Sequence, residues 1–168
     1  MHQHQLTQGD VDRVLIRAPA AHLRNLMHEN PQTPAEAKFS LEYSLAAALH
    51  SSDISLADYA SDALRRPHVR ALMPRITKEY VEKLESEFPT EVRLFLRGGE
   101  CVETAIAMPV GSKDHPMSDA HLWQKLENCL AAAPSFTGTE QLLTELEKLD
   151  PHKPIRQLTL ALQSSQAP

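Results

Sequence analysis

A tyrosine inside a helical pattern is the side chain of this sequence best suited to chemistry. Tyr43 lies within residues 33–49, which predict one helix because the segment opens with a Thr-x-x-Glu capping box and has proline at the first helical position. A phenolic hydroxyl can donate a hydrogen bond or a proton, so Tyr43 is the candidate catalytic residue. Ser40, roughly one turn away on the same side, is a candidate substrate-binding residue.

Helical spacing places apolar residues on two sides of this segment. Leu41 and Leu45 belong to one stripe, while Tyr43, Ala46 and Ala47 belong to a second stripe on nearly the opposite side. A helix with two apolar sides is expected to be covered on both. One interpretation of Tyr43 is therefore a core aromatic residue whose hydroxyl donates to a backbone carbonyl.

His115 is a second candidate for substrate binding. It follows a glycine turn at Gly111 and precedes a helix that Ser118 is expected to cap, and backbone amides at a helix start can receive an anion. The alternative is an ordinary exposed loop histidine. Nine histidines are present, but no His-x3-His or His-Glu-x-x-His pair occurs, and His2 and His4 lie in the polar N-terminal segment, so no metal site is predicted.

Four arginines between residues 65 and 75 form a further candidate cluster. The fork geometry of guanidinium groups suits carboxylates, so Arg65, Arg66, Arg70 and Arg75 could hold a tricarboxylate. The alternative is a solvated helix face that pairs with nearby acids such as Asp58.

Bulk composition excludes several classes of protein. The chain has 168 residues, a formal net charge of −5 and a pI near 6.0, which argues against a nucleic-acid partner because phosphate binding requires clustered basic residues. No signal core and no run of roughly 20 apolar residues occurs, so no membrane partner is expected. Two cysteines make no disulfide framework. We expect a cytoplasmic protein.

The remaining elements predict an α+β fold with a small antiparallel sheet of three or four strands packed against several helices. Alternation predicts strands at 11–17, 76–84, 91–97 and 100–108, with Gly98-Gly99 as a two-residue hairpin turn that sets Phe95 opposite Val102. Helices are expected at 118–132, from 137, and at 155–162. The expected organisation is a flexible N-terminus (1–9), a single domain (10–163) and a frayed tail (164–168).

Several motifs, in order, resemble one known family. The run Ala-Lys-Phe-Ser-Leu-Glu-Tyr-Ser-Leu-Ala-Ala-Ala-Leu at 37–49 resembles the helix that follows the domain crossover of the MmgE/PrpD family, which includes 2-methylcitrate dehydratase, cis-aconitate decarboxylase and iminodisuccinate epimerase. Residues 10–17, 67–76 and 111–126 resemble its strand ahead of that helix, its helix-to-strand passage and the opening of its last large helix. The resemblance covers about residues 10 to 150 and identifies the C-terminal α+β domain.

The resemblance implies a lyase without cofactor that acts on di- or tricarboxylates such as 2-methylcitrate, an acid of propionate catabolism. It implies that Tyr43 is the active-site tyrosine and faces a crevice toward a helical domain. The other acid/base groups of the family, carried by that domain and by the segment just upstream, have no counterparts here. A dehydratase needs at least two positioned acid/base groups, so the isolated chain is expected to be inactive.

A different class of function stays open. The chain could be a non-catalytic module for interaction or dimerisation, or one half of a split enzyme completed by a separately encoded helical domain. The apolar side that carries Phe39, Ala46 and Ala47 would then be an interface.

Overall fold

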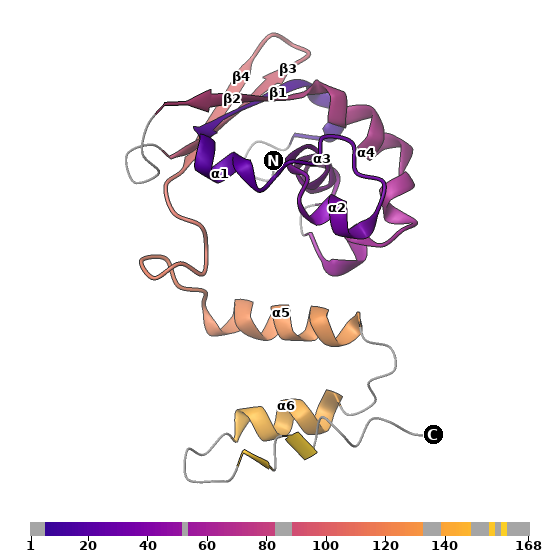
Figure 1. Ribbon diagram of the computed structural model, residues 1–168, viewed down its shortest axis with the longest axis vertical. Coiled ribbons are helices and arrows are strands. Elements are labelled where there is room, and N and C mark those ends of the chain that lie inside the picture. The colour runs from indigo at the N-terminus through magenta and orange to yellow at the C-terminus, as the bar shows by residue number, and fades with distance from the viewer. Residues whose placement is uncertain are drawn as a thin grey trace. The chain divides into compact units, whose positions relative to one another are not determined.

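The computed structural model describes residues 6–51, 54–82, 89–132, 139–148, 155–156 and 159–160 (Figure 1). It divides into two compact units, Met1–Met117 and Ser118–Pro168, and each unit is described by itself. The predicted frayed tail and part of the predicted flexible N-terminus lie outside the described residues. Among the described residues, no helix has the length and apolar content that crossing a membrane requires.

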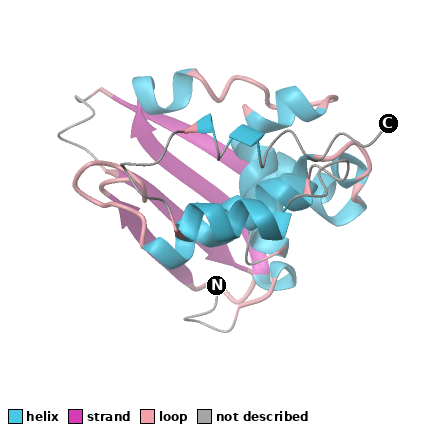
Figure 2. Ribbon diagram, turned by 90° about the horizontal axis from the view of Figure 1, so that it is seen from below, coloured by secondary structure: helices cyan, strands magenta, loops and turns pink. Residues whose placement is uncertain are grey.

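The first unit is built on one four-stranded sheet. Its strands are β1 (Val11–Pro19), β2 (Ile76–Val81), β3 (Thr90–Leu96) and β4 (Cys101–Ile106), in the order β2-β1-β3-β4. β1 contributes several residues to the hydrophobic core, since Val11, Val14, Ile16 and Ala18 are all buried. The strands and the helices packed on them confirm the predicted α+β class (Figures 1 and 2).

One strand pair differs from the expected antiparallel sheet. β1 pairs with β3 and β3 with β4 in antiparallel fashion, but β1 and β2 are parallel, with Val14 opposite Ile76. The chain leaves the end of β1 and returns to the start of β2 through a long helical segment, which is the crossover that a parallel pair requires. The sheet is therefore mixed.

The predicted hairpin between β3 and β4 exists, but its register is shifted by one residue. Phe95 lies opposite Cys101 and Leu94 opposite Val102, so the expected pairing of Phe95 with Val102 is wrong. The Leu96 amide donates to the Glu100 carbonyl at 2.8 Å, which leaves three residues in the loop instead of two. Gly99 has φ of +88°, the left-handed conformation that closes such a three-residue turn.

Short helices connect β1 to β2 and cover the sheet. They are α1 (Ala20–Arg24), α2 (Pro34–Lys38), α3 (Leu41–His50) and α4 (Pro67–Leu72), with 3-10 turns η3 (Leu56–Tyr59), η4 (Ala63–Arg65) and η5 (Met73–Arg75). α3 packs on α4 and β2, and α1 packs on β1. Apolar residues of α3 and α4, including Ala46 and Leu72, belong to the same buried cluster as β1.

The helix predicted at 33–49 is in fact two helices. The predicted capping box is confirmed: the Glu36 amide donates to the Thr33 hydroxyl, and Glu36 accepts from the Thr33 amide. The helix then ends at Lys38, and a new one begins at Leu41 because the Ser40 hydroxyl accepts the Tyr43 amide at 3.1 Å. A serine that can cap competes with helix continuation at this point.

The side of α3 that the chain's own core covers differs from the expected one. Tyr43, Ala46 and Ala47 are buried, whereas Leu41 and Leu45 are only partly buried at the edge of the core. The Tyr43 side, expected to face something outside this chain, instead packs into the chain's own core. The expectation of an exposed Tyr43 face is therefore wrong for the chain as described.

The second unit contains α5 (Asp119–Ala131) and α6 (Thr139–Glu147). The predicted start of α5 is confirmed, since the Ser118 hydroxyl accepts the His121 amide at 3.3 Å. The helix predicted at 155–162 lies largely outside the described residues. Both cysteines of the chain, Cys101 and Cys129, are free and exposed.

Candidate functional site

Tyr43 occupies the centre of a buried polar cluster. Its side chain is fully buried, and its hydroxyl donates to the backbone carbonyl of Asp58 in η3. The ring of Tyr59 lies 5.9 Å away between centroids, and the Tyr59 hydroxyl is 3.0 Å from the hydroxyl of Ser44. The structure thus agrees with the interpretation of Tyr43 as a core aromatic residue whose hydroxyl donates to a backbone carbonyl.

Asp58 links this cluster to the start of α4. One carboxylate oxygen accepts the Ser55 amide at 2.9 Å, and the other accepts the Arg66 guanidinium at 2.7 Å. Burial would raise the pKa of Asp58, but the bond from Ser55 and the charge and bond of Arg66 lower it below its ordinary value. Asp58 is therefore a stable anion that ties η3 to Arg66.

The surroundings of Tyr43 keep its hydroxyl protonated. Burial raises the pKa of Tyr43 above its ordinary value, and the nearby Asp58 charge acts in the same direction. The positive charges of Arg66 and Arg70 act in the opposite direction without overcoming burial. Tyr43 is therefore protonated at neutral pH, which suits it to donate a hydrogen bond and not to act as a base, while the raised pKa makes it a weaker acid than an exposed tyrosine.

The other predicted site residues lie apart from the Tyr43 hydroxyl. Ser40 is buried, and its hydroxyl is engaged as the cap of α3 rather than open to a ligand. His115 is exposed in a tight turn, where its carbonyl accepts the Gly111 amide at 2.7 Å. The structure therefore brings Ser40 and Tyr43 together through the backbone, but it leaves His115 on the surface while Tyr43 is in the interior.

The arginine cluster divides into separate roles. Arg66 pairs with Asp58, as the solvated-face alternative expected, and Arg75 donates to the carbonyls of Val11 and Asp12. Arg70 alone of the four lines a pocket, which the sequence reasoning missed.

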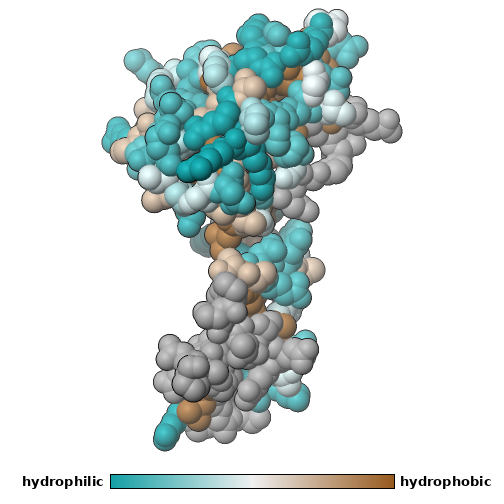
Figure 3. Space-filling view, turned by 90° about the vertical axis from the view of Figure 1, so that its right-hand side faces the viewer, coloured by the Kyte–Doolittle hydropathy of each residue, from teal (hydrophilic) through white to brown (hydrophobic). Residues whose placement is uncertain are grey.

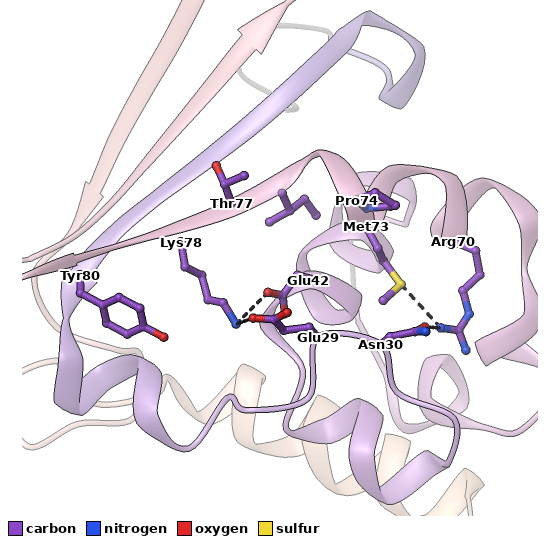
Figure 4. A pocket seen from close by; sticks show the side chains of 10 residues that line it. Glu29, Asn30, Glu42, Arg70, Met73, Pro74, Thr77, Lys78 and Tyr80 are labelled. Carbon is purple, nitrogen blue, oxygen red and sulfur yellow. Dashed lines mark hydrogen bonds and ion pairs between the residues drawn. The ribbon is translucent and has the colours of Figure 1, made fainter.

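This pocket, of about 590 Å³, lies between α3, α4 and β2 within the first unit. At its centre Lys78 of β2 and Glu42 of α3 form a buried ion pair, with Nζ and Oε1 2.8 Å apart and both side chains less than a tenth exposed. Glu29 adds a second carboxylate, 3.7 Å from the same Nζ. Figure 4 shows these three side chains converging, with the Tyr80 ring beside them.

Lys78 is held as a cation by these carboxylates. Burial alone would lower the pKa of Lys78, but the hydrogen bond and charge of Glu42, with the charge of Glu29, raise it above its ordinary value. Lys78 Nζ also lies 3.5 Å from the carbonyl of Leu26. Nζ thus has two oxygens within hydrogen-bond distance, those of Glu42 and Leu26, and the Glu29 carboxylate as a longer ion-pair partner.

The sequence analysis did not identify this pair. Glu42 interrupts an apolar helix segment, and Lys78 lies on a strand that follows a run of arginines, but nothing in the spacing of either residue indicates that they meet. Their contact depends on the parallel pairing of β1 and β2, which the sequence did not reveal. No group of three or more potential metal ligands occurs among the residues that the structure describes.

Comparison with known proteins gives two matches. The family model of the MmgE/PrpD C-terminal domain matches residues 1–149. Cis-aconitate decarboxylase of Mus musculus is 24% identical over 143 residues, an alignment that covers 83% of this chain and 29% of the mouse protein. The chain thus spans less than a third of the length of this relative.

Proposed function

Because this chain belongs to the MmgE/PrpD C-terminal domain family, we propose that it forms the C-terminal part of a lyase that breaks a bond next to a carboxylate. The match over residues 1–149 is the observation that carries the proposal. The similarity to a decarboxylase supports the same class of reaction.

Tyr43 is the proposed acid or hydrogen-bond donor of this reaction. Elimination and decarboxylation both leave a carbon or oxygen that must receive a proton, and a protonated tyrosine can supply it. To do so, the Tyr43 hydroxyl must leave the Asp58 carbonyl, which requires a shift of η3 or of the tyrosine side chain. Arg66 and Arg70, whose charges reach Tyr43, would favour a carboxylate nearby.

The substrate proposed is a di- or tricarboxylate, with 2-methylcitrate or cis-aconitate as the first compounds to test. Dehydration of 2-methylcitrate would place the chain in propionate catabolism. The reaction is proposed to need no cofactor and to take place in the cytoplasm. One acid/base candidate does not suffice for both proton transfers, so a helical domain is the proposed partner that supplies the rest.

Nuclear magnetic resonance titration tests carboxylate binding at this cluster. We expect cis-aconitate or 2-methylcitrate to shift the amide signals of Tyr43 and Asp58, with smaller shifts in the variant Tyr43→Phe. Acetate at the same ionic strength serves as the control for general anion effects. Equal shifts with acetate, or shifts confined to exposed lysines and arginines, would argue against a carboxylate site here.

The second candidate is the non-catalytic interaction module. One observation in its favour is that the Tyr43 hydroxyl is buried and bonded to the Asp58 carbonyl, where it cannot contact a substrate. A second is Phe39, an apolar side chain that is 53% exposed. The face of the first unit drawn in Figure 3 is mainly hydrophilic. Light scattering distinguishes the two: a dimer that Phe39→Ser dissociates supports the module, and a monomer at all concentrations opposes self-association.

A further inference from the structure

The pocket between α3, α4 and β2 has charged groups of opposite sign at its two ends. At one end Glu29 and Glu42 share the single cation Lys78, which leaves one negative charge in excess. Arg70 lies at the other end, and Figure 4 shows it on the far side of Met73 from the Lys78 group. The pocket therefore carries a separated pair of opposite charges.

The negative end has an unused acceptor. Glu42 is 5% exposed, and its Oε1 bonds Lys78, but its Oε2 is buried and accepts no hydrogen bond from the described residues. A buried carboxylate oxygen without a donor is costly and rare in folded proteins. Since Lys78 bonds the other oxygen, Oε1, and no other described residue donates to Oε2, this oxygen is left to accept a hydrogen bond from a ligand.

The positive end has no counter-ion. Arg70 donates to the carbonyls of Leu64 and Pro31, both at 2.6 Å, and to the Asn30 side-chain oxygen at 2.9 Å. All these partners are neutral, and among the described residues no carboxylate is within ion-pair distance of Arg70. The Met73 sulfur, 4.0 Å from Nη1, is a further weak acceptor. One of the five guanidinium N–H groups, on Nη2, is therefore left to bind an anion, in a side chain that neutral partners already hold in place.

We propose that this pocket binds a zwitterion, a small amino acid whose ammonium group and carboxylate lie at opposite ends of a short apolar chain. The ammonium group would donate to Glu42 and Glu29, and the carboxylate would accept from Arg70. Met73, Pro74 and Ile76 line the pocket and would contact the chain between the charges. The volume of about 590 Å³ is in the usual range for small-molecule sites.

The net charge of the residues that line the pocket disfavours ligands that carry a net charge of their own. Two carboxylates and two cations sum to zero, so a tricarboxylate would bring an uncompensated negative charge into the pocket, and a diamine would bring an uncompensated positive charge. The inference does not rest on the proposed lyase function, because Tyr43 does not line this pocket.

Calorimetric titration of the full chain with a matched set of ligands tests the proposal. The set is 5-aminopentanoate, its isomer 2-aminopentanoate, and the singly charged analogues pentanoate and pentylamine. We expect 5-aminopentanoate to bind with a Kd on the order of 1 mM or tighter. Each singly charged analogue is expected to bind at least about tenfold more weakly, because it lacks one charge-assisted hydrogen bond.

Variants then locate the bound ligand. Glu29→Gln changes an exposed side chain and should raise the Kd of 5-aminopentanoate about tenfold. Glu42→Gln and Arg70→Lys should each raise this Kd by a similar factor. Glu79→Gln is the matched control, since Glu79 is also ion-paired on β2 but lies outside the pocket and should leave the Kd unchanged.

Three results would overturn the proposal. They are no binding of 5-aminopentanoate by the wild-type chain, a singly charged analogue that binds as tightly, and a Kd that Glu29→Gln and Arg70→Lys leave unchanged. Equal or tighter binding of 2-aminopentanoate would contradict the placement of the two charges at opposite ends. Because carboxylate binding at Tyr43 is measured with other ligands and other signals, failure of one proposal is distinguishable from failure of the other.

Discussion

Three polar side chains of this protein, those of Tyr43, Lys78 and Glu42, are buried and bonded within the chain. Tyr43 is a core residue whose hydroxyl is bonded within the chain, and its raised pKa follows from that burial. Lys78 and Glu42 are charges that the fold buries together. The residue types alone could nominate Tyr43, because a phenol among apolar residues stands out in a sequence. They could not identify Lys78 as a site residue, because a lysine on a strand is ordinarily solvated and its burial here depends on the ion pair with Glu42.

Removing the Tyr43 hydroxyl is expected to destabilise the chain. Tyr43→Phe keeps the packed ring but leaves the buried Asp58 carbonyl without its donor, which should lower the free energy of unfolding by about 1–3 kcal/mol. Urea denaturation measures this change. The control is Tyr80→Phe, because Tyr80 is 59% exposed and its hydroxyl can bond water. Equal stabilities of Tyr43→Phe and the wild type would contradict the buried hydrogen bond.

Acidification is expected to weaken the fold through Asp58. Since the pKa of Asp58 is lower in the folded chain than in the unfolded one, its contribution is present above the unfolded value of about 4 and is lost as the pH falls through the folded value. The free energy of unfolding should therefore drop below about pH 5, and less steeply in Asp58→Asn. Arg66→Gln should flatten the same profile, because it removes the cation that lowers this pKa. Parallel profiles in all three proteins would refute this role.

At the scale of elements, local chemistry predicted where segments begin more reliably than how they pack. The caps at Thr33 and Ser118 and the hairpin near Gly99 were predictable, since each depends on neighbouring residues alone. The break at Ser40 and the parallel β1–β2 pair were not, because a capping serine competes with helix continuation and strand pairing is decided by contacts distant in sequence.

The cap at Ser40 gives an element-scale prediction. Ser40→Ala removes the acceptor of the buried Tyr43 amide at the start of α3, so the free energy of unfolding should fall by about 1–2 kcal/mol. Chemical denaturation of Ser61→Ala, at an exposed serine, provides the comparison and should show a change below about 0.5 kcal/mol. If both variants lose the same small amount, the break between α2 and α3 does not depend on this cap.

For the whole molecule, family membership indicates the class of reaction, whereas the geometry shows the state of the proposed catalytic residue. The match to the MmgE/PrpD C-terminal domain fixes the ancestry of residues 1–149, and the α+β class predicted from the sequence agrees with it. The geometry adds that the hydroxyl of the tyrosine proposed for catalysis is buried and bonded to the Asp58 carbonyl, and that a separate charged pocket exists in the same unit. The proposed lyase therefore depends on a partner that opens the Tyr43 cluster and supplies further acid/base groups.

Complementation tests this central claim most directly. Residues 1–149 are fused to the part of mouse cis-aconitate decarboxylase that this chain does not cover, and release of CO₂ from cis-aconitate is measured for the fusion, for its Tyr43→Phe variant and for the isolated chain. The account predicts release by the fusion, a loss of at least about a hundredfold in Tyr43→Phe, in line with removal of a general acid, and none by the isolated chain. A folded fusion that binds cis-aconitate without releasing CO₂, or one that Tyr43→Phe leaves fully active, would contradict it.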